Sequence, residues 1–345
     1  MAGGSCLLGS LNLSEFVVHP FTPKAYFDID KFVDAVETAV IGLNEVLDEG
    51  IELHPLQIQR DNARDWRQIG LGVMGIADMF IKMGIVYGSE ASFNLSKKIG
   101  HMLLNTALLT SSELARINGT FPKYNESALF ESDFFMENVS PFVLGYIKAH
   151  GLRNSQILTI APTGSISTMW GISGGIEPIF ATHFDRKTES LHGEEVVYRV
   201  YQPIVKEYME VTGIKAIPKL MVTAHDLHWK DRIKMQGVWQ HFIDASISST
   251  VNLPKETTVE EVEELFIEAW KQGLKGVTIF RDGCKRAGIL TVDSIETTTL
   301  GDEEPMALQI ESVQDRILCG DCGAEIEVFS GGCSICMECG WSPCN

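Results

Sequence analysis

Cysteine thiols are the side chains of this chain best suited to chemistry, and six of its eight cysteines fall within the last 27 residues. Cys319 and Cys322 form one Cys-x2-Cys pair followed by glycine, and Cys336 and Cys339 form another. In such a pair, two thiolates and the N–H groups of a tight turn face one metal ion. The 13 residues between the pairs suit a tetrahedral zinc site with four thiolate ligands. The spacing therefore predicts zinc in the tail.

The same tail holds more thiols than one zinc ion needs, because Cys333 and Cys344 add to the two pairs. The zinc ligands are then Cys319, Cys322 and Cys336, with either Cys339 or Cys333 as the fourth. Using Cys333 leaves Cys339 and Cys344 free for thiol–disulfide exchange, so we favour that set. The alternative interpretation is a zinc ribbon that only folds the tail.

A second candidate for chemistry is the loop at residues 162–167, which lies between a β-prone stretch and a helical stretch. A turn of this kind presents unpaired N–H groups and hydroxyls to an anion, and its glycine allows close approach. From spacing alone, an ordinary capped turn is the simpler interpretation, and Cys6 is more simply a small buried residue than a reactive thiol. The loop residues are Pro162, Thr163, Gly164, Ser165, Ile166 and Ser167.

The elements that must position these residues are mainly helices. Apolar residues recur at helical spacing in residues 30–47, 66–83, 91–117 and 231–247. A capping box at Thr258 and Glu261 begins a further helix that extends to about residue 272. Short β segments are expected at residues 154–159 and 276–280. This alternation predicts the α/β class.

Three units are expected along the chain. Residues 1–290 form the main domain, residues 291–316 read as a flexible linker rich in Thr, Glu and Asp, and residues 317–345 form the Cys-rich unit.

Composition limits the location and the partners of the chain. The net charge of −18 argues against nucleic-acid binding, which depends on neutralising phosphates with Lys and Arg. A small anionic substrate is still allowed, because backbone N–H groups at a helix start can hold it. No apolar run is long enough to span a membrane, and the first residues carry no secretory signal. Clustered cysteines indicate a reducing compartment, so we expect the chain in the cytoplasm.

Several segments, in a consistent order, resemble the large chain of ribonucleotide reductases. The match covers nearly all of the chain and includes GSCLLGSLNL at 4–13, NARDWRQIGLG at 62–72, LTIAPTGSIS at 158–167, GGIEP at 174–178, ISSTVNLP at 247–254 and GVTIFRDG at 276–283. Two features resemble the cobalamin-dependent (class II) enzymes. Oxygen-dependent reductases have two adjacent tyrosines where this chain has Thr278, Ile279 and Phe280, and the cysteine array of the tail is similar to class II tails.

The resemblance implies a fold and a role for each candidate residue. The fold would be the C-terminal half of a ten-stranded α/β barrel, and adenosylcobalamin would be the cofactor. Residues 162–167 would hold the phosphates of a ribonucleotide, and Cys6 would be one of the two thiols that reduce it. Cys339 and Cys344 would reduce the resulting disulfide and then be reduced by a thioredoxin-like protein.

One family motif does not occur in these 345 residues. Reductases carry the radical cysteine in Asn-x-Cys-x-Glu, shortly before the segment that matches Cys6, and the sequence contains no such motif. We therefore expect the chain to need the N-terminal portion of a reductase and to be inactive alone. Two alternatives are a noncatalytic zinc-ribbon protein that binds nucleotides or a partner, and an inert gene fragment. Whether the substrate is a di- or triphosphate is open.

Overall fold

The computed structural model describes residues 4–189 and 195–284, together with two short strands near the C-terminus. The predicted linker at 291–316 and all six tail cysteines lie outside the described residues, so the zinc and shuttle assignments stay predictions. The strands are β1 (Leu7–Asn12), β2 (Val17–Val18), β3 (Tyr26–Phe27), β4 (Ile69–Met74), β5 (His183–Glu189), β6 (Glu195–Tyr201), β7 (Thr250–Leu253), β8 (Thr278–Arg281), β9 (Glu327–Val328) and β10 (Ser334–Ile335).

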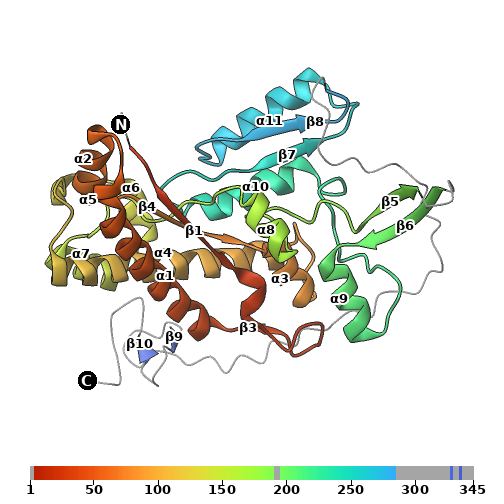
Figure 1. Ribbon diagram of the computed structural model, residues 1–345, viewed down its shortest axis with the longest axis horizontal. Coiled ribbons are helices and arrows are strands. Elements are labelled where there is room, and N and C mark those ends of the chain that lie inside the picture. The colour runs from red at the N-terminus through yellow and green to blue at the C-terminus, as the bar shows by residue number, and fades with distance from the viewer. Residues whose placement is uncertain (1–3, 190–194, 285–326, 329–333, 336–345) are drawn as a thin grey trace.

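Helices connect most of these strands, and Figure 1 shows their arrangement. In chain order they are the 3-10 turn η1 (Leu13–Phe16), α1 (Ile29–Gly50), the 3-10 turn η2 (Ile51–Leu53), α2 (Gln57–Trp66), α3 (Ile76–Lys82), α4 (Glu90–Asn118), α5 (Glu126–Phe130), α6 (Asp133–Asn138), α7 (Pro141–His150), α8 (Gly164–Trp170), α9 (Pro203–Thr212), α10 (Trp229–Gln240) and α11 (Val259–Lys271). The predicted α/β class is confirmed.

A parallel array of extended segments forms the centre of the fold. β1 pairs with β4 in parallel, and β4 in turn pairs with residues 157–160 through the Leu71–Leu158 bridge. That third segment pairs in parallel with Ile247, from which the chain continues into β7 beside β8. Parallel pairing needs long crossover connections, which the helices supply. The carboxyl ends of five parallel segments therefore meet at one edge.

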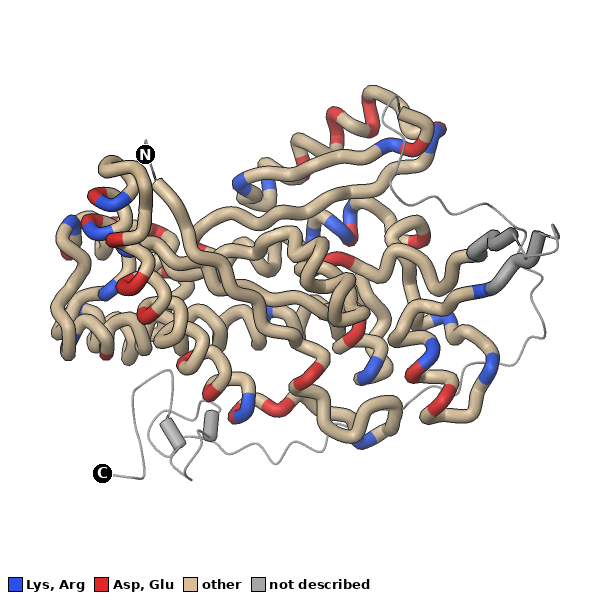
Figure 2. The backbone as a smooth tube through the Cα atoms, viewed as in Figure 1, with Lys and Arg blue, Asp and Glu red and all other residues tan. Residues whose placement is uncertain are grey.

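The two faces of this array differ. Alternate residues of β1 face α1, where a Cβ built on Gly9 would lie 3.4 Å from Leu43 Cδ1. The opposite face carries Cys6, Leu8 and Ser10, and Leu8 is 58% exposed. Helices α1 and α4 pack together on the first face and enclose the main apolar core (Figure 1). β1 and β4 carry no charged residue, whereas Arg281 lies on β8 (Figure 2).

Two glycines let the third segment lie unusually close to β4. A Cβ built on Gly72 would be 2.1 Å from the Thr159 carbonyl oxygen, a separation that no real side chain could adopt. A Cβ on Gly70 would be 2.6 Å from Thr159 Cγ2 and 2.7 Å from Cys6 Sγ. The side of β4 that faces away from α1 therefore presents backbone at these two glycines, with Cys6 and Thr159 meeting above Gly70.

A buried amide network joins the helices to the array. Asn154 lies just before the third segment, and its Oδ1 accepts hydrogen bonds from Ser111 Oγ at 2.9 Å and Asn44 Nδ2 at 3.1 Å. Its Nδ2 donates to Asn44 Oδ1 and to the Arg67 carbonyl oxygen, both at 2.9 Å. This buried amide thus makes all four of its hydrogen bonds, and they join α1, α4 and the residue that ends α2.

One predicted helix is wrong. Residues 66–83 include strand β4 followed by α3. Gly70 and Gly72 are poor helix formers, and they alternate with apolar residues in the way that is typical of a strand. Arg67 ends α2 in the left-handed conformation, with φ 47°, and turns the chain into the strand.

The other expected elements agree with the structure to differing degrees. Helices at 30–47 and 91–117 are confirmed as α1 and α4, and the Thr258–Glu261 capping box begins α11. The helix expected at 231–247 ends at Gln240, because the chain then turns into the array. The β segment expected at 154–159 begins three residues before the paired residues 157–160, and the one expected at 276–280 begins two residues before β8. Within the described residues, no helix is both long and apolar enough to cross a membrane.

The close approach at Gly72 predicts a large effect of a single methyl group. Gly72→Ala should lower the free energy of unfolding by about 2–4 kcal/mol, because backbone atoms must separate to admit the Cβ. Gly42→Ala is the matched control, since a Cβ in the middle of α1 would meet nothing within 4 Å. It should raise stability by up to about 1 kcal/mol. Urea unfolding followed by circular dichroism measures both, and equal stability of the two variants would contradict this packing.

Candidate functional site

The predicted anion loop lies directly after the third segment of the array, at its carboxyl edge, and leads into α8. Thr163 is buried in the left-handed conformation, with φ 53°. Its Oγ1 accepts a hydrogen bond from the Gly175 N–H at 2.9 Å. Buried Ser167 donates through its Oγ to the Gly164 carbonyl oxygen at 3.2 Å. These inward hydroxyls help to fix the shape of the loop.

The remaining loop residues face outward. Pro162, Gly164, Ser165 and Ile166 are exposed, and a Cβ built on Gly164 would meet nothing within 4 Å. The first N–H groups of a helix have no acceptor within it, so those at the start of α8 are free to bind a ligand. An approaching anion would therefore meet backbone N–H groups and the Ser165 hydroxyl.

The segment after α8 packs against the loop. A Cβ built on Gly174 would lie 2.9 Å from the Pro162 carbonyl oxygen. The Ser173 N–H donates to Asp78 Oδ2 at 2.7 Å, and the Ala77 N–H donates to Ser173 Oγ at 3.2 Å. Burial raises the pKa of Asp78, which no lysine or arginine contacts within 4.0 Å in the described part of the chain. The support thus depends on a carboxylate inside the fold.

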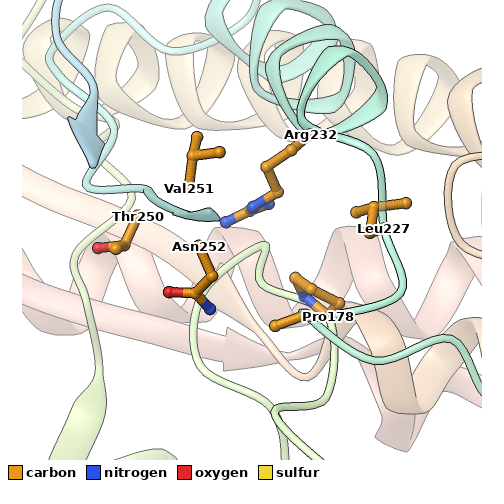
Figure 3. A pocket seen from close by; sticks show the side chains of 7 residues that line it. Pro178, Leu227, Arg232, Thr250, Val251 and Asn252 are labelled. Carbon is orange, nitrogen blue, oxygen red and sulfur yellow. The ribbon is translucent and has the colours of Figure 1, made fainter. Parts of the chain in front are cut away.

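A buried arginine fastens the other end of this segment. Arg232 reaches from α10 towards Pro178 and β7, as Figure 3 shows, beside a pocket about the size of one water molecule. Its Nη1 donates to the Ile176 carbonyl oxygen and to Tyr87 Oη, both at 2.7 Å. Its Nη2 lies 2.7 Å from Glu177 Oε1, which also accepts the Thr250 N–H at 3.0 Å. The loop support is thereby tied to β7.

Cys6 is half-buried at the amino end of β1 and lies on the side of the array opposite α1. Its Sγ lies 3.5 Å from Gln156 Nε2, and its thiol is directed towards the Leu7 carbonyl oxygen at 3.8 Å. Burial raises the pKa of this thiol from 9.0 to about 11, and the charge of Asp244 adds to the increase. The hydrogen bond from Gln156 acts in the opposite direction. At neutral pH the group is therefore a thiol and not a thiolate.

The structure brings Cys6 and the loop onto one surface. Gln156, beside Cys6, directly precedes the third segment, and Pro162 follows its end. Thr159 lies between them on the same side, because it and Cys6 both contact the position above Gly70. The third segment thus extends from the side of Cys6, the candidate reducing thiol, to the candidate anion loop at residues 162–167.

Several residues of this site were missed by sequence reasoning. Gln68, Gln156 and Asp244 surround Cys6, while Asp78 and Arg232 support the loop. A sequence signal exists for the two carboxylates, since Asp78 and Asp244 each interrupt an apolar run. In the described ranges 4–189 and 195–284, no group of three or more His, Cys, Asp or Glu side chains could hold a metal ion.

Comparison with known proteins identifies the family to which these features correspond. A family model described as "Ribonucleotide reductase, barrel domain" matches residues 2–280. The chain is 30% identical to a "Vitamin B12-dependent ribonucleoside-diphosphate reductase" of Mycobacterium tuberculosis over 306 residues, which cover 83% of this chain and 40% of the relative. It is 31% identical to a protein of the same name in Thermoplasma acidophilum over 335 residues, covering 91% and 40%.

A relative with a different name is also similar. The "Ribonucleoside-diphosphate reductase large chain" of Neurospora crassa is 28% identical over 302 residues, covering 78% of this chain and 31% of the relative. The chain spans about 40% of the length of its B12-dependent relatives.

The surroundings of Cys6 predict an unreactive thiol. With a pKa near 11, the thiolate fraction at pH 8 is about 100-fold below that of a thiol with the ordinary value of 9.0. Alkylation of Cys6 by iodoacetamide, followed by peptide mass spectrometry, should be slower by about that factor than alkylation of a short cysteine peptide. Because the folded-state pKa is raised, the rate should continue to rise from pH 9 to pH 10. A plateau below pH 9 would contradict this environment.

Proposed function

We propose a function for this chain from the premise that it belongs to the ribonucleotide reductase family, whose barrel-domain model matches residues 2–280. The chain supplies the substrate-phosphate loop and one reducing thiol of an enzyme that converts ribonucleotides to 2′-deoxyribonucleotides. Its parallel array is the C-terminal half of a ten-stranded barrel. The observation that carries this proposal is that the segment leading into residues 162–167 contacts Cys6, through Gln156 and through the position above Gly70.

The reaction requires a dithiol and an anion site close together. The ribose loses its 2′ hydroxyl as water, while two thiols give up two electrons and two hydrogens and become one disulfide. Cys6 is one of those thiols, and its neutral state at pH 7 supports this role, because both sulfurs begin the reaction with a proton. The second thiol and the radical cysteine come from the N-terminal portion of the reductase, in keeping with the 40% share of the relatives that this chain spans.

Adenosylcobalamin is the cofactor that we propose. Two relatives named as B12-dependent are 30% and 31% identical to this chain. Met169 and Trp170 on α8 are 75% and 66% exposed, and these apolar side chains would contact a corrin ring. When bound, the cofactor supplies the radical that starts the reaction. The residues of this chain then hold the phosphates, position Cys6 and limit the access of water.

The tail completes the proposed cycle. Cys339 and Cys344 reduce the disulfide that contains Cys6 and form a disulfide with each other. A thioredoxin-like protein then reduces the Cys339–Cys344 disulfide by thiol–disulfide exchange. Cys319, Cys322, Cys333 and Cys336 bind zinc, and four thiolates form the donor set that zinc prefers. A cycle of this kind needs a reducing compartment, so we place it in the cytoplasm.

Reconstitution tests the proposed activity. The chain is mixed with the N-terminal portion of the reductase, adenosylcobalamin, dithiothreitol and either a ribonucleoside di- or triphosphate, and deoxyribonucleotide is measured. The mixture should turn over and the lone chain should not. Cys6→Ser should lower turnover by about 100-fold or more, because the disulfide cannot form.

Cys284→Ser is the matched control for that assay, since Cys284 is exposed and lies in the turn after β8. It should leave turnover unchanged. Turnover that survives loss of Cys6 would favour a nucleotide-binding role without catalysis, and turnover by the lone chain would contradict the need for an N-terminal portion.

Metal analysis tests the tail separately. The purified chain should contain one zinc ion, and Cys333→Ser should release it while Cys339→Ser retains it, because only the loss of a ligand opens the site. Cys6→Ser serves as the control and should retain zinc. Release by Cys339→Ser alone would assign the alternative ligand set.

A further inference from the structure

Gln156 contacts the Cys6 thiol, Gln68 contacts Gln156, and the charge of Asp244 acts on the thiol. None of these three residues belongs to those assigned above to the reaction. Gln68 Nε2 donates to Gln156 Oε1 at 3.3 Å, and Gln156 Nε2 lies 3.5 Å from Cys6 Sγ. Because the Gln156 oxygen is occupied by Gln68, its NH2 group must face the sulfur. The pair therefore forms a directed hydrogen-bond chain that ends on Cys6.

Asp244 lies behind this chain, in the turn between α10 and β7. Its two carboxylate oxygens accept the N–H groups of Ile157 at 2.8 Å and Leu158 at 2.7 Å. These are the residues directly after Gln156, so the carboxylate fixes the backbone from which Gln156 extends. Burial raises the pKa of Asp244 to about 6, so the group still carries its charge at pH 7.

We propose that Gln156 is a positioning residue for the reducing thiol and that Asp244 opposes it, so that the two groups together set the protonation state of Cys6. This inference rests on the proposed role of Cys6 in substrate reduction. Gln156 directs Sγ over Gly70 and stabilises the thiolate by hydrogen bonding, while the negative charge of Asp244 favours the neutral thiol.

Within the part of the chain that the structure describes, the other neighbours of Cys6 contribute no competing charge. Leu8 and Thr159 meet the thiol above Gly70, and both are uncharged. Asp244 is the charged group that acts on Cys6. Lys275 is the cation that faces Asp244, and its Nζ donates to the Asp244 carbonyl oxygen at 2.6 Å. The positive charge of Lys275 lowers the pKa of Asp244 and so favours its charged form.

The balance has a chemical consequence for the proposed cycle. Cys6 must keep its proton while substrate is bound and release it when the disulfide forms. When the tail reduces that disulfide, Cys6 leaves as a thiolate and takes up a proton again. The Gln156 amide stabilises the leaving thiolate, and Asp244 promotes its reprotonation.

The rate of Cys6 alkylation against pH tests the proposal in the full chain. Iodoacetamide is used between pH 7 and pH 10, and the Cys6 peptide is quantified by mass spectrometry with Cys284 as internal reference. Gln156→Leu should lower the Cys6 rate about three- to tenfold, because the thiolate loses its hydrogen bond. Asp244→Asn should raise it by a similar factor, because the opposing charge is gone.

Opposite signs distinguish the proposal from a structural effect, since loosened packing would expose the sulfur and raise both rates. Gln57→Leu and Asp30→Asn, on the exposed surface of α2 and α1, are matched controls and should change neither rate. If Asp244→Asn fails to fold, Gln156→Glu replaces it and should slow alkylation further than Gln156→Leu, because it adds a negative charge. Changes of less than twofold, or of one sign for Gln156→Leu and Asp244→Asn, would overturn the proposal.

This experiment uses no nucleotide, cobalamin or N-terminal polypeptide. A chain that fails in the reductase assay can therefore still confirm the roles of Gln156 and Asp244. Equally, unchanged alkylation rates would overturn those roles and leave the proposed activity standing.

Discussion

The contact between Gly72 and the Thr159 carbonyl oxygen is the constraint on which the rest of the site depends. A Cβ at position 72 would lie 2.1 Å from that oxygen, so the third segment can nest against β4 only because both Gly70 and Gly72 lack side chains. This nesting brings Gln156 to Cys6 at one end and aligns the anion loop at the other. A chemical site is thus built on backbone, with few side chains between its two halves.

The elements that could be predicted were those with a strong local signal. Helices α1 and α4 have long apolar stripes, and the Thr258–Glu261 box marks the start of α11. The strand β4 was taken for helix although Gly70 and Gly72 alternate with Ile69, Leu71 and Val73, because the apolar residues that continue into α3 extended the helical pattern across it. The burial of Ile69, Leu71 and Val73 depends on packing with the rest of the fold. Tertiary contacts decided that element.

The candidate site divides in a similar way. Cys6 and residues 162–167 could be found from the resemblance of their segments to a known family, although spacing alone favoured plainer interpretations. The residues that control them could not be found, because Gln156 meets Cys6, and Asp244 meets Ile157, only after the chain has folded. Asp78 and Arg232 likewise hold the segment that supports the loop through buried hydrogen bonds, to Ser173 and to Ile176. These contacts also form only after the chain has folded.

The parallel pairing of β1 with β4 has a consequence for how the molecule assembles in time. Leu7 pairs with Ile69, and Leu71 with Leu158, so each new strand can join only after a whole helical excursion has been closed into a loop. Closing such loops costs chain entropy before any contact repays it, which slows folding. Leu8 on β1 is 58% exposed, and neither β1 nor β4 carries a charged residue, so during this slow process these strands lack the charges that discourage association between strand edges.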